Sequence, residues 1–157
     1  MTKNRILLWD LETTNLNADF GYILVAGYKW LGEKKVYTPS IADFPGKNIV
    51  DDSKLVAHFA EVFEEATTHV TWYGSRFDLP MINSKLIQYG QSPLPVTPHI
   101  DGWRVAKYKL KLHSNRLASV QEFLGLPTAK TPVRGVEWLK AMAGDRKALK
   151  YIVDHCK

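Results

Sequence analysis

Two carboxylates, Asp10 and Glu12, are separated only by Leu11 at the end of an apolar run in the stretch RILLWDLETT. Like charges repel, and burying each one is costly unless a partner compensates. Side chains two apart on a strand point to the same face, so we expect Asp10 and Glu12 to project together. A hard divalent cation with oxygen ligands, such as Mg²⁺, is the compensation that this pattern predicts.

A third carboxylate, Asp78, follows the apolar run HVTWYG and begins a helical pattern in YGSRFDLP. Taken alone, Asp78 is more simply an N-cap ahead of Pro80. The pair of carboxylates in the same chain reverses this preference, because sites on sheets usually lie at strand ends. We therefore predict that Asp78 joins Asp10 and Glu12.

The elements that must position these carboxylates form an α/β domain around a mixed sheet. Apolar runs predict strands over 5–12, 22–30, 34–38 and 69–74. Helical spacing predicts helices over 51–66, 77–90, 114–125 and 136–142, and one that starts at Asp145. We expect Asp52 or Ser53 to cap the first of these helices and Ser114 to cap the third.

Composition bounds the class of protein. The chain has 157 residues, which fits one domain, and it has no apolar run near the roughly 18 residues of a membrane span. A single cysteine, Cys156, excludes an internal disulfide and suits a reducing cytoplasm. The net charge of +5 is compatible with a polyanionic partner and equally with a solvated surplus of lysine, so charge does not decide the function.

The motifs WDLETT, YGSRFDLP and KYIVDHC, in this order, resemble those of the DEDD (DnaQ-like) superfamily of 3′→5′ exonucleases, in the branch related to proofreading domains of family B DNA polymerases. The resemblance implies a ribonuclease H-like fold in which Asp10, Glu12 and Asp78 bind two Mg²⁺ or Mn²⁺ ions. It also implies that Thr13 and Leu16 touch the terminal nucleotide.

By the same resemblance, Phe77 lies beside the scissile sugar, and Ser75 stands where the family often has Asn. The family's third motif is a Tyr or His followed one helical turn later by a metal-binding Asp. His155 matches its first position as a catalytic residue, and the Asp would fall beyond Lys157. We therefore expect a single exonuclease-like domain over 1–157 that lacks the end of its C-terminal helix. An alternative register pairs Tyr151 with Asp154, three residues apart.

The segment GWRVAKYKLKLHSNR interleaves cations with Trp103 and Tyr108, as surfaces for single-stranded nucleic acid do. We favour the plainer interpretation that both rings are core and the lysines are solvated. Asp101 is expected to cap the following helix, outside the site. Trp9 and Trp72 are expected in the core.

The function that these observations predict is two-metal-ion hydrolysis at single-stranded or frayed 3′ ends of DNA or RNA. Two alternatives share the same residues. One is a nuclease-like module that binds nucleic acid without turnover, and the other is a ribonuclease H-like endonuclease. No residue identifies a reader of the 2′-hydroxyl, so DNA and RNA are not distinguished.

Overall fold

A mixed four-stranded sheet organises the protein in a computed structural model, which describes residues 4–127 and 133–156. The strands are β1 (Ile6–Thr13), β2 (Ile23–Trp30), β3 (Thr68–Thr71) and β4 (His99–Asp101). Their order is β2-β1-β3-β4, with β2 antiparallel to β1 and the other neighbours parallel. The expected α/β class with a mixed sheet is confirmed.

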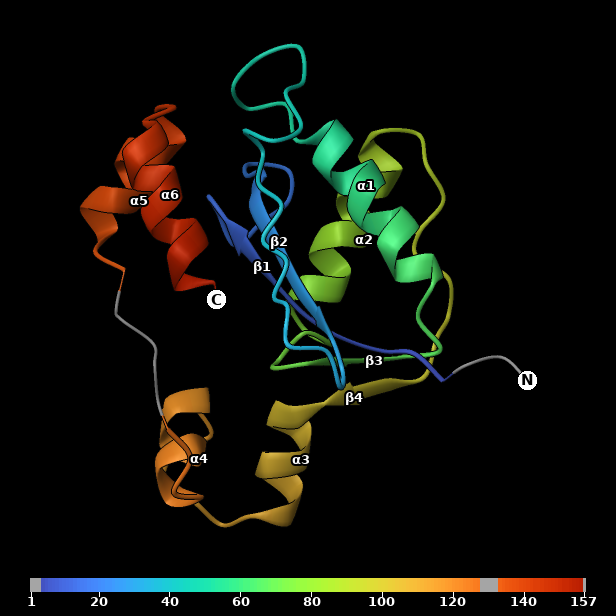
Figure 1. Cartoon of the computed structure of the whole chain (residues 1–157), viewed down its shortest axis with the longest axis vertical. Coiled ribbons are helices and arrows are strands. Elements are labelled where there is room, and N and C mark those ends of the chain that lie inside the picture. Colours follow the sequence, from blue (N-terminus) through green and yellow to red (C-terminus); the bar gives the residue numbers. More distant parts are fainter. Residues whose placement is uncertain (1–3, 128–132, 157) are drawn as a thin grey trace.

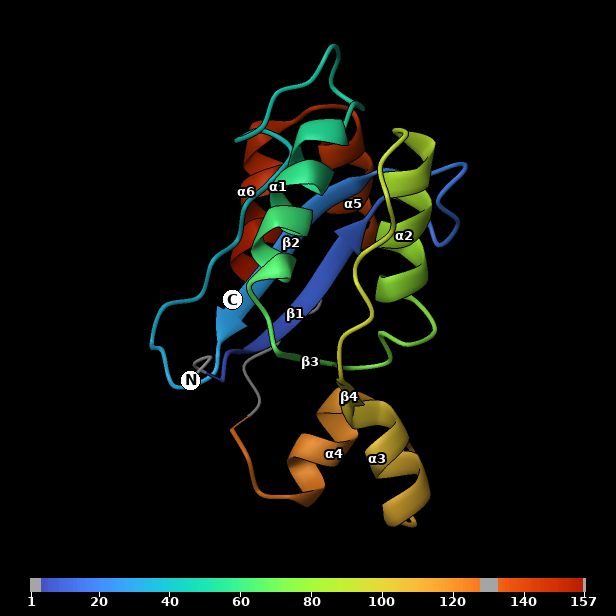
Figure 2. The same cartoon turned by 90° about the vertical axis from the view of Figure 1, so that its right-hand side faces the viewer.

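Helices cover both faces of the sheet and extend beyond one end of it (Figure 1). The helices α1 (Ser53–Glu64) and α2 (Asp78–Gln88) lie on one side, and the hairpin of α5 (Gly135–Met142) and α6 (Arg146–His155) lies on the other. The helices α3 (Gly102–Lys109) and α4 (Leu117–Phe123) project below the sheet, away from both layers, as the turned view in Figure 2 also shows.

Strand β1 separates the core from the carboxylates by simple alternation. Leu7, Trp9 and Leu11 are buried, and the ring of Trp9 packs 5.0 Å from that of Phe59 in α1. The residues that alternate with them, including Asp10 and Glu12, face the other side and are only half-buried. A period of two therefore places the apolar residues under α1 and the acidic ones toward α6.

Asp52 is fully buried, yet its side chain does not cap α1 as expected. Its carboxylate instead accepts hydrogen bonds from the backbone N–H of Ile23, at 2.6 Å, and from the hydroxyl of Tyr89. Lys85 of α2 places its ammonium 4.0 Å away. One compensated charge thus fastens α1 and α2 to β2.

The expected strand over 34–38 is wrong. This segment meets β2 only at an isolated bridge, where Tyr37 and Tyr28 exchange backbone hydrogen bonds of 2.8 Å and stack their rings 4.8 Å apart. Pro39, which has no N–H to donate, follows directly, so a longer ladder does not form.

Other boundaries also differ from those expected. The strand predicted over 69–74 ends at Thr71, because the chain turns at Tyr73, where φ is 68°. Ser114 does not cap α4, which begins at Leu117 after an Arg116 N-cap that makes no side-chain cap bond. The start of α6 at Asp145 is confirmed, and the carboxylate of this residue caps the helix by accepting from the N–H groups of Lys147 and Ala148.

No helix within residues 4–127 and 133–156 combines the length and the apolar character needed to cross a bilayer.

His69 is a buried residue of β3, 2% exposed, to which the sequence assigned no role. Its Nδ1 accepts a hydrogen bond of 3.1 Å from the indole N–H of Trp9, and its ring stacks on that of His99. Burial, with a smaller contribution from the charge of His99, lowers the pKa of His69 to about 4. The core therefore requires this imidazole to be neutral.

We expect the free energy of unfolding to fall as the pH drops from about 6.5 to 4, because the unfolded chain takes up the proton of His69 first. The loss approaches about 3 kcal/mol at pH 4, from a pKa difference of about 2.5 units. In urea denaturation, the free energy of unfolding of His69→Gln should depend less on pH between about 6.5 and 4 than that of the parent. The exposed control His113→Gln should follow the parent chain, and an unaltered pH dependence in His69→Gln would contradict the assignment.

Candidate active site

The carboxylates of Asp10 and Glu12 lie on one face near the end of β1. The strand continues through Thr13, as their shared orientation requires, and the register against β2 shifts only after Glu12. Both side chains are half-buried on the face that α6 approaches. The sequence-based prediction that they project together is consistent with this alternation.

Asp78 reaches β1 because β1 and β3 part early. Their parallel pairing extends only to Leu8 and Val70, so the ladder does not reach the N–H of Leu11. The carboxylate of Asp78 accepts that N–H at 3.0 Å, and Asp78 is 2% exposed. Asp78 is the first residue of α2, and Phe77 occupies the N-cap position. The simple capping role for Asp78 is therefore wrong.

The electrostatics of Asp78 show that the three carboxylates act on one another. Burial, followed by the charge of Asp10 and to a smaller extent that of Glu12, raises the pKa of Asp78 to about 7, although the backbone N–H groups of Leu11 and of Asp78 itself lower it. A buried carboxylate among like charges is a frequent mark of a functional site. A nearby cation would remove this penalty by favouring the ionised form.

The last turn of α6 lies against the same carboxylates. The thiol of Cys156 is 3.7 Å from a carboxylate oxygen of Glu12. Among the described residues, one ligand atom each from Asp10, Glu12 and Cys156 lie within 4.8 Å of one another, and Asp78 is not part of that group. His155 is half-buried in the same turn. Sequence reasoning missed the position of Cys156, which no spacing indicated.

Asp154 points elsewhere. Its carboxylate is 2.7 Å from the ammonium of Lys150 one turn earlier, and its side chain is 45% exposed. Tyr151, its partner in the alternative register, is also exposed. The helix therefore does not bring Tyr151 and Asp154 into the group formed by Asp10 and Glu12.

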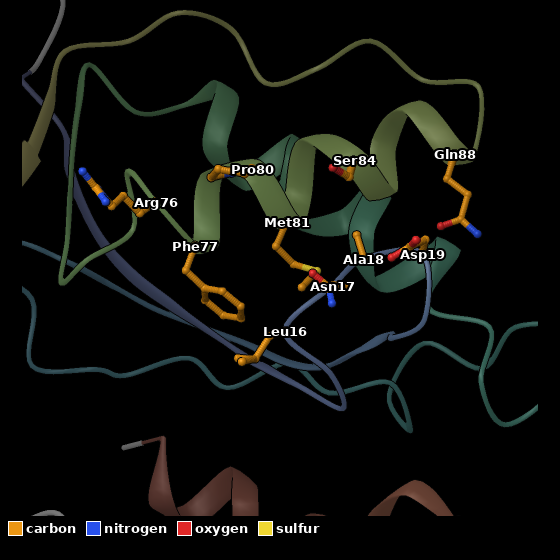
Figure 3. Close-up of a pocket in the computed structure, with 10 residues that line it drawn as sticks. All are labelled: Leu16, Asn17, Ala18, Asp19, Arg76, Phe77, Pro80, Met81, Ser84 and Gln88. Atoms are coloured by element: carbon orange, nitrogen blue, oxygen red, sulfur yellow. The ribbon is translucent and has the colours of Figure 1, made fainter.

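A cavity of about 590 Å³ lies beside the start of α2. Leu16 and Phe77, 61 positions apart, face each other at one end of it (Figure 3). Thr13 does not line this cavity, and its hydroxyl donates to the carbonyl of Asn15 at 2.8 Å. A second cavity, of about 460 Å³, is lined by Asp10, Trp72 and Cys156 among others. Trp72, expected in the core, is only half-buried there.

Asp101 holds the loop that leads to Asp78. It caps α3 as expected, accepting from the N–H of Trp103 at 3.1 Å. It also accepts from the N–H of Tyr73 at 2.8 Å, and from both the N–H and the hydroxyl of Ser75. Burial raises the pKa of Asp101, but these hydrogen bonds outweigh burial and keep it below its usual value. Ser75 thus has a structural partner.

Comparison with solved structures shows the same fold in nucleic-acid enzymes. The family B DNA polymerase of the hyperthermophilic archaeon Pyrobaculum calidifontis matches 98% of this chain with a TM-score of 0.73 and 15% identity. Exonuclease I in complex with an inhibitor matches 99% of it, with a TM-score of 0.62 and 15% identity. The chain spans 23% of the polymerase and 44% of exonuclease I.

Sequence comparisons add the family. No curated protein matches the chain. The model of the RNase H superfamily, RNase_H_2, matches residues 7–157, which include every carboxylate described above. The mixed sheet with helices on both faces is accordingly an RNase H-like fold, and the protein belongs to the RNase H superfamily.

Proposed function

We propose that the protein is a metal-dependent 3′→5′ exonuclease of the DEDD type, acting on single-stranded or frayed 3′ ends. The observation that carries the proposal is the buried carboxylate of Asp78, held by the N–H of Leu11 in the field of Asp10 and Glu12. Superfamily membership makes nuclease chemistry the natural use of such a cluster. The structural match to exonuclease I supports attack at chain ends over internal cleavage.

The donor set fits Mg²⁺ or Mn²⁺. Both ions prefer carboxylate oxygen, which Asp10, Glu12 and Asp78 supply. Burial and the charges of Asp10 and Glu12 raise the pKa of Asp78, a penalty that a bound cation would offset. Ions held by these residues would lower the pKa of water and would offset negative charge on the departing oxygen. We assign the ion-holding role to these three carboxylates.

The other residues bind and orient the substrate. Leu16 and Phe77 clamp the terminal nucleotide from opposite walls of the larger cavity. His155, in the turn of α6 next to Cys156, holds the attacking water by a hydrogen bond. Thr13 supports substrate binding because its hydroxyl donates to the carbonyl of Asn15 and so fixes the loop that carries Leu16.

The direct test uses oligonucleotides labelled at either end, together with a closed single-stranded circle, in Mg²⁺ and in Mn²⁺. We expect mononucleotides to be released from free 3′ ends while the circle stays intact. Cuts within the circle would identify an endonuclease. Binding without cleavage of any substrate would identify a nuclease-like binding module. Either result would overturn the proposal.

Asp78→Asn should abolish hydrolysis and yet leave the metal-free protein as stable as the parent or more so. The amide keeps an oxygen for the N–H of Leu11 but removes a charge whose folded pKa is about 7 instead of 3.8. That charge lowers stability progressively as the pH rises from about 4 to 7, so the gain should be larger at pH 8 than at pH 5. Thermal unfolding in EDTA measures it.

Asp154→Asn is the matched control, since it removes the same charge from an exposed side chain paired with Lys150. It should retain activity. Loss of turnover in Asp154→Asn would make Asp154 a ligand. Full turnover in Asp78→Asn would refute the assignment of the site.

Leu16→Ala should raise the KM for a single-stranded substrate about fivefold, the equivalent of about 1 kcal/mol of lost apolar contact with the terminal base. The side chain is 80% exposed, so the melting temperature should not change. Phe20→Ala is the control, because Phe20 is 79% exposed on the same loop but does not line the cavity. Equal effects of the two substitutions on KM would remove Leu16 from the substrate site.

A further inference from the structure

One segment of the chain carries positive charge with no acidic residue among it. Between Asp101 and Glu122 there is no acidic residue, and the segment carries five cations: Arg104, Lys107, Lys109, Lys111 and Arg116. The other 16 Lys and Arg residues are matched by the 16 Asp and Glu residues of the chain. The stretch of α3 and the residues that follow it, 102–121, therefore carries a local charge of +5.

This segment also exposes aromatic and apolar side chains beside its cations. All five cations are exposed, Tyr108 is 70% exposed, and Trp103 is only half-buried. Ala106 is the single buried residue of α3, which projects beyond the sheet in Figure 1. The plainer interpretation, with both rings in the core, is wrong for Tyr108. Solvated lysines alone do not explain why rings accompany them.

Tyr73 connects this surface to the candidate active site. Among the described residues it is the one non-glycine with positive φ, at 68°, a conformation that disfavours a bulky side chain. Its ring packs edge-to-face on Trp103 with centroids 4.9 Å apart, and the ammonium of Lys107 lies 5.0 Å from the Trp103 ring centre. Two rings and a cation thus form a continuous row of contacts from the loop before Phe77 to α3.

We propose that Tyr73, Trp103 and the cations of segment 102–121 form a track for single-stranded nucleic acid, which holds the nucleotides upstream of the reacting 3′ end. This inference rests on the proposed function. Aromatic faces stack on bases of any sequence, and cations on the same helix contact the phosphates between them. A folded protein partner would not require the rings and cations to alternate along one helix.

Asp101 is the positioning residue of this track. The same carboxylate accepts the N–H of Tyr73 in its strained conformation and the N–H of Trp103 at the start of α3. It therefore fixes both rings relative to Ser75, three residues before Asp78. The strained conformation of Tyr73 is held by the hydrogen bond from its N–H to Asp101, as is expected where a side chain must be presented.

The ring of Tyr73 can be removed without disturbing its backbone. Asn tolerates positive φ, so Tyr73→Asn should keep the turn and hold the melting temperature, whereas Tyr73→Phe keeps the ring. We measure binding of fluorescent oligo(dT) of 16 nucleotides by anisotropy in EDTA, where no turnover occurs. Tyr73→Asn should weaken binding about tenfold, and Tyr73→Phe should stay within about twofold of the parent.

Charge is tested by a matched pair of triple variants. Replacing Lys107, Lys109 and Lys111 with Gln should make the log–log dependence of affinity on salt shallower by about 2, at about 0.7 per phosphate contact on a single strand. The control replaces three exposed lysines elsewhere, Lys34, Lys54 and Lys147, and so changes the net charge equally. The control should keep the parent slope.

The binding assays separate the track from the proposed function. Parent-like affinity in Tyr73→Asn, or equal slopes in the two triple variants, would overturn the track even if the protein degrades 3′ ends. The expected losses of affinity in a chain that hydrolyses nothing would support the track and overturn the exonuclease. Stacking would also be contradicted if Tyr73→Phe lost as much affinity as Tyr73→Asn and both variants melted at a lower temperature than the parent.

Discussion

The early parting of β1 and β3 is the constraint on which the candidate site depends. Their pairing ends at Leu8 and Val70, although β1 continues to Thr13. A ladder that continued would occupy the edge of β1, and the N–H of Leu11 would not be available to a side chain. Because the strands separate, Asp78 makes that bond and α2 starts against the strand that carries Asp10 and Glu12.

Three buried aspartates show how the same group serves structure or chemistry. Asp52 has the hydroxyl of Tyr89, the N–H of Ile23 and a nearby ammonium. Asp101 accepts from three backbone N–H groups and a hydroxyl, which keep its pKa low. Asp78 accepts the N–H of Leu11, but its burial and the charges of Asp10 and Glu12 outweigh that bond and raise its pKa. Donors and a nearby cation that compensate the buried charge identify Asp52 and Asp101 as structural. The charge of Asp78 is less compensated, which makes Asp78 the candidate to bind a cation.

The local pattern of the sequence predicted what depends on local rules. Strand alternation correctly gave the shared face of Asp10 and Glu12, and helical spacing gave α1, α2 and the start of α6 at Asp145. The roles of these residues in binding metal and substrate stay predictions. Strand β4 was missed because three residues are too few to show a period.

What the sequence did not predict is set by contacts between distant residues. Asp101 looked like a cap and is one, but its bonds to Tyr73 and Ser75 span 28 and 26 positions. Asp52 had the right residue type for a cap and was instead recruited by Ile23 and Tyr89. The partner of each carboxylate depends on which N–H groups have no backbone acceptor in the folded chain, and residue spacing does not predict this.

The loop between β3 and α2 therefore has two fixed ends with different purposes. Asp101 fixes its beginning at Tyr73 and Ser75, and Asp78 fixes its end on Leu11. Only Arg76 and Phe77 lie between these attachments, and both line the larger cavity. A short loop held at both ends loses little further conformational freedom when a ligand binds, so binding energy is not spent on ordering it. The strain at Tyr73 and the unfavourable burial of Asp78 are the stability costs of this preorganisation.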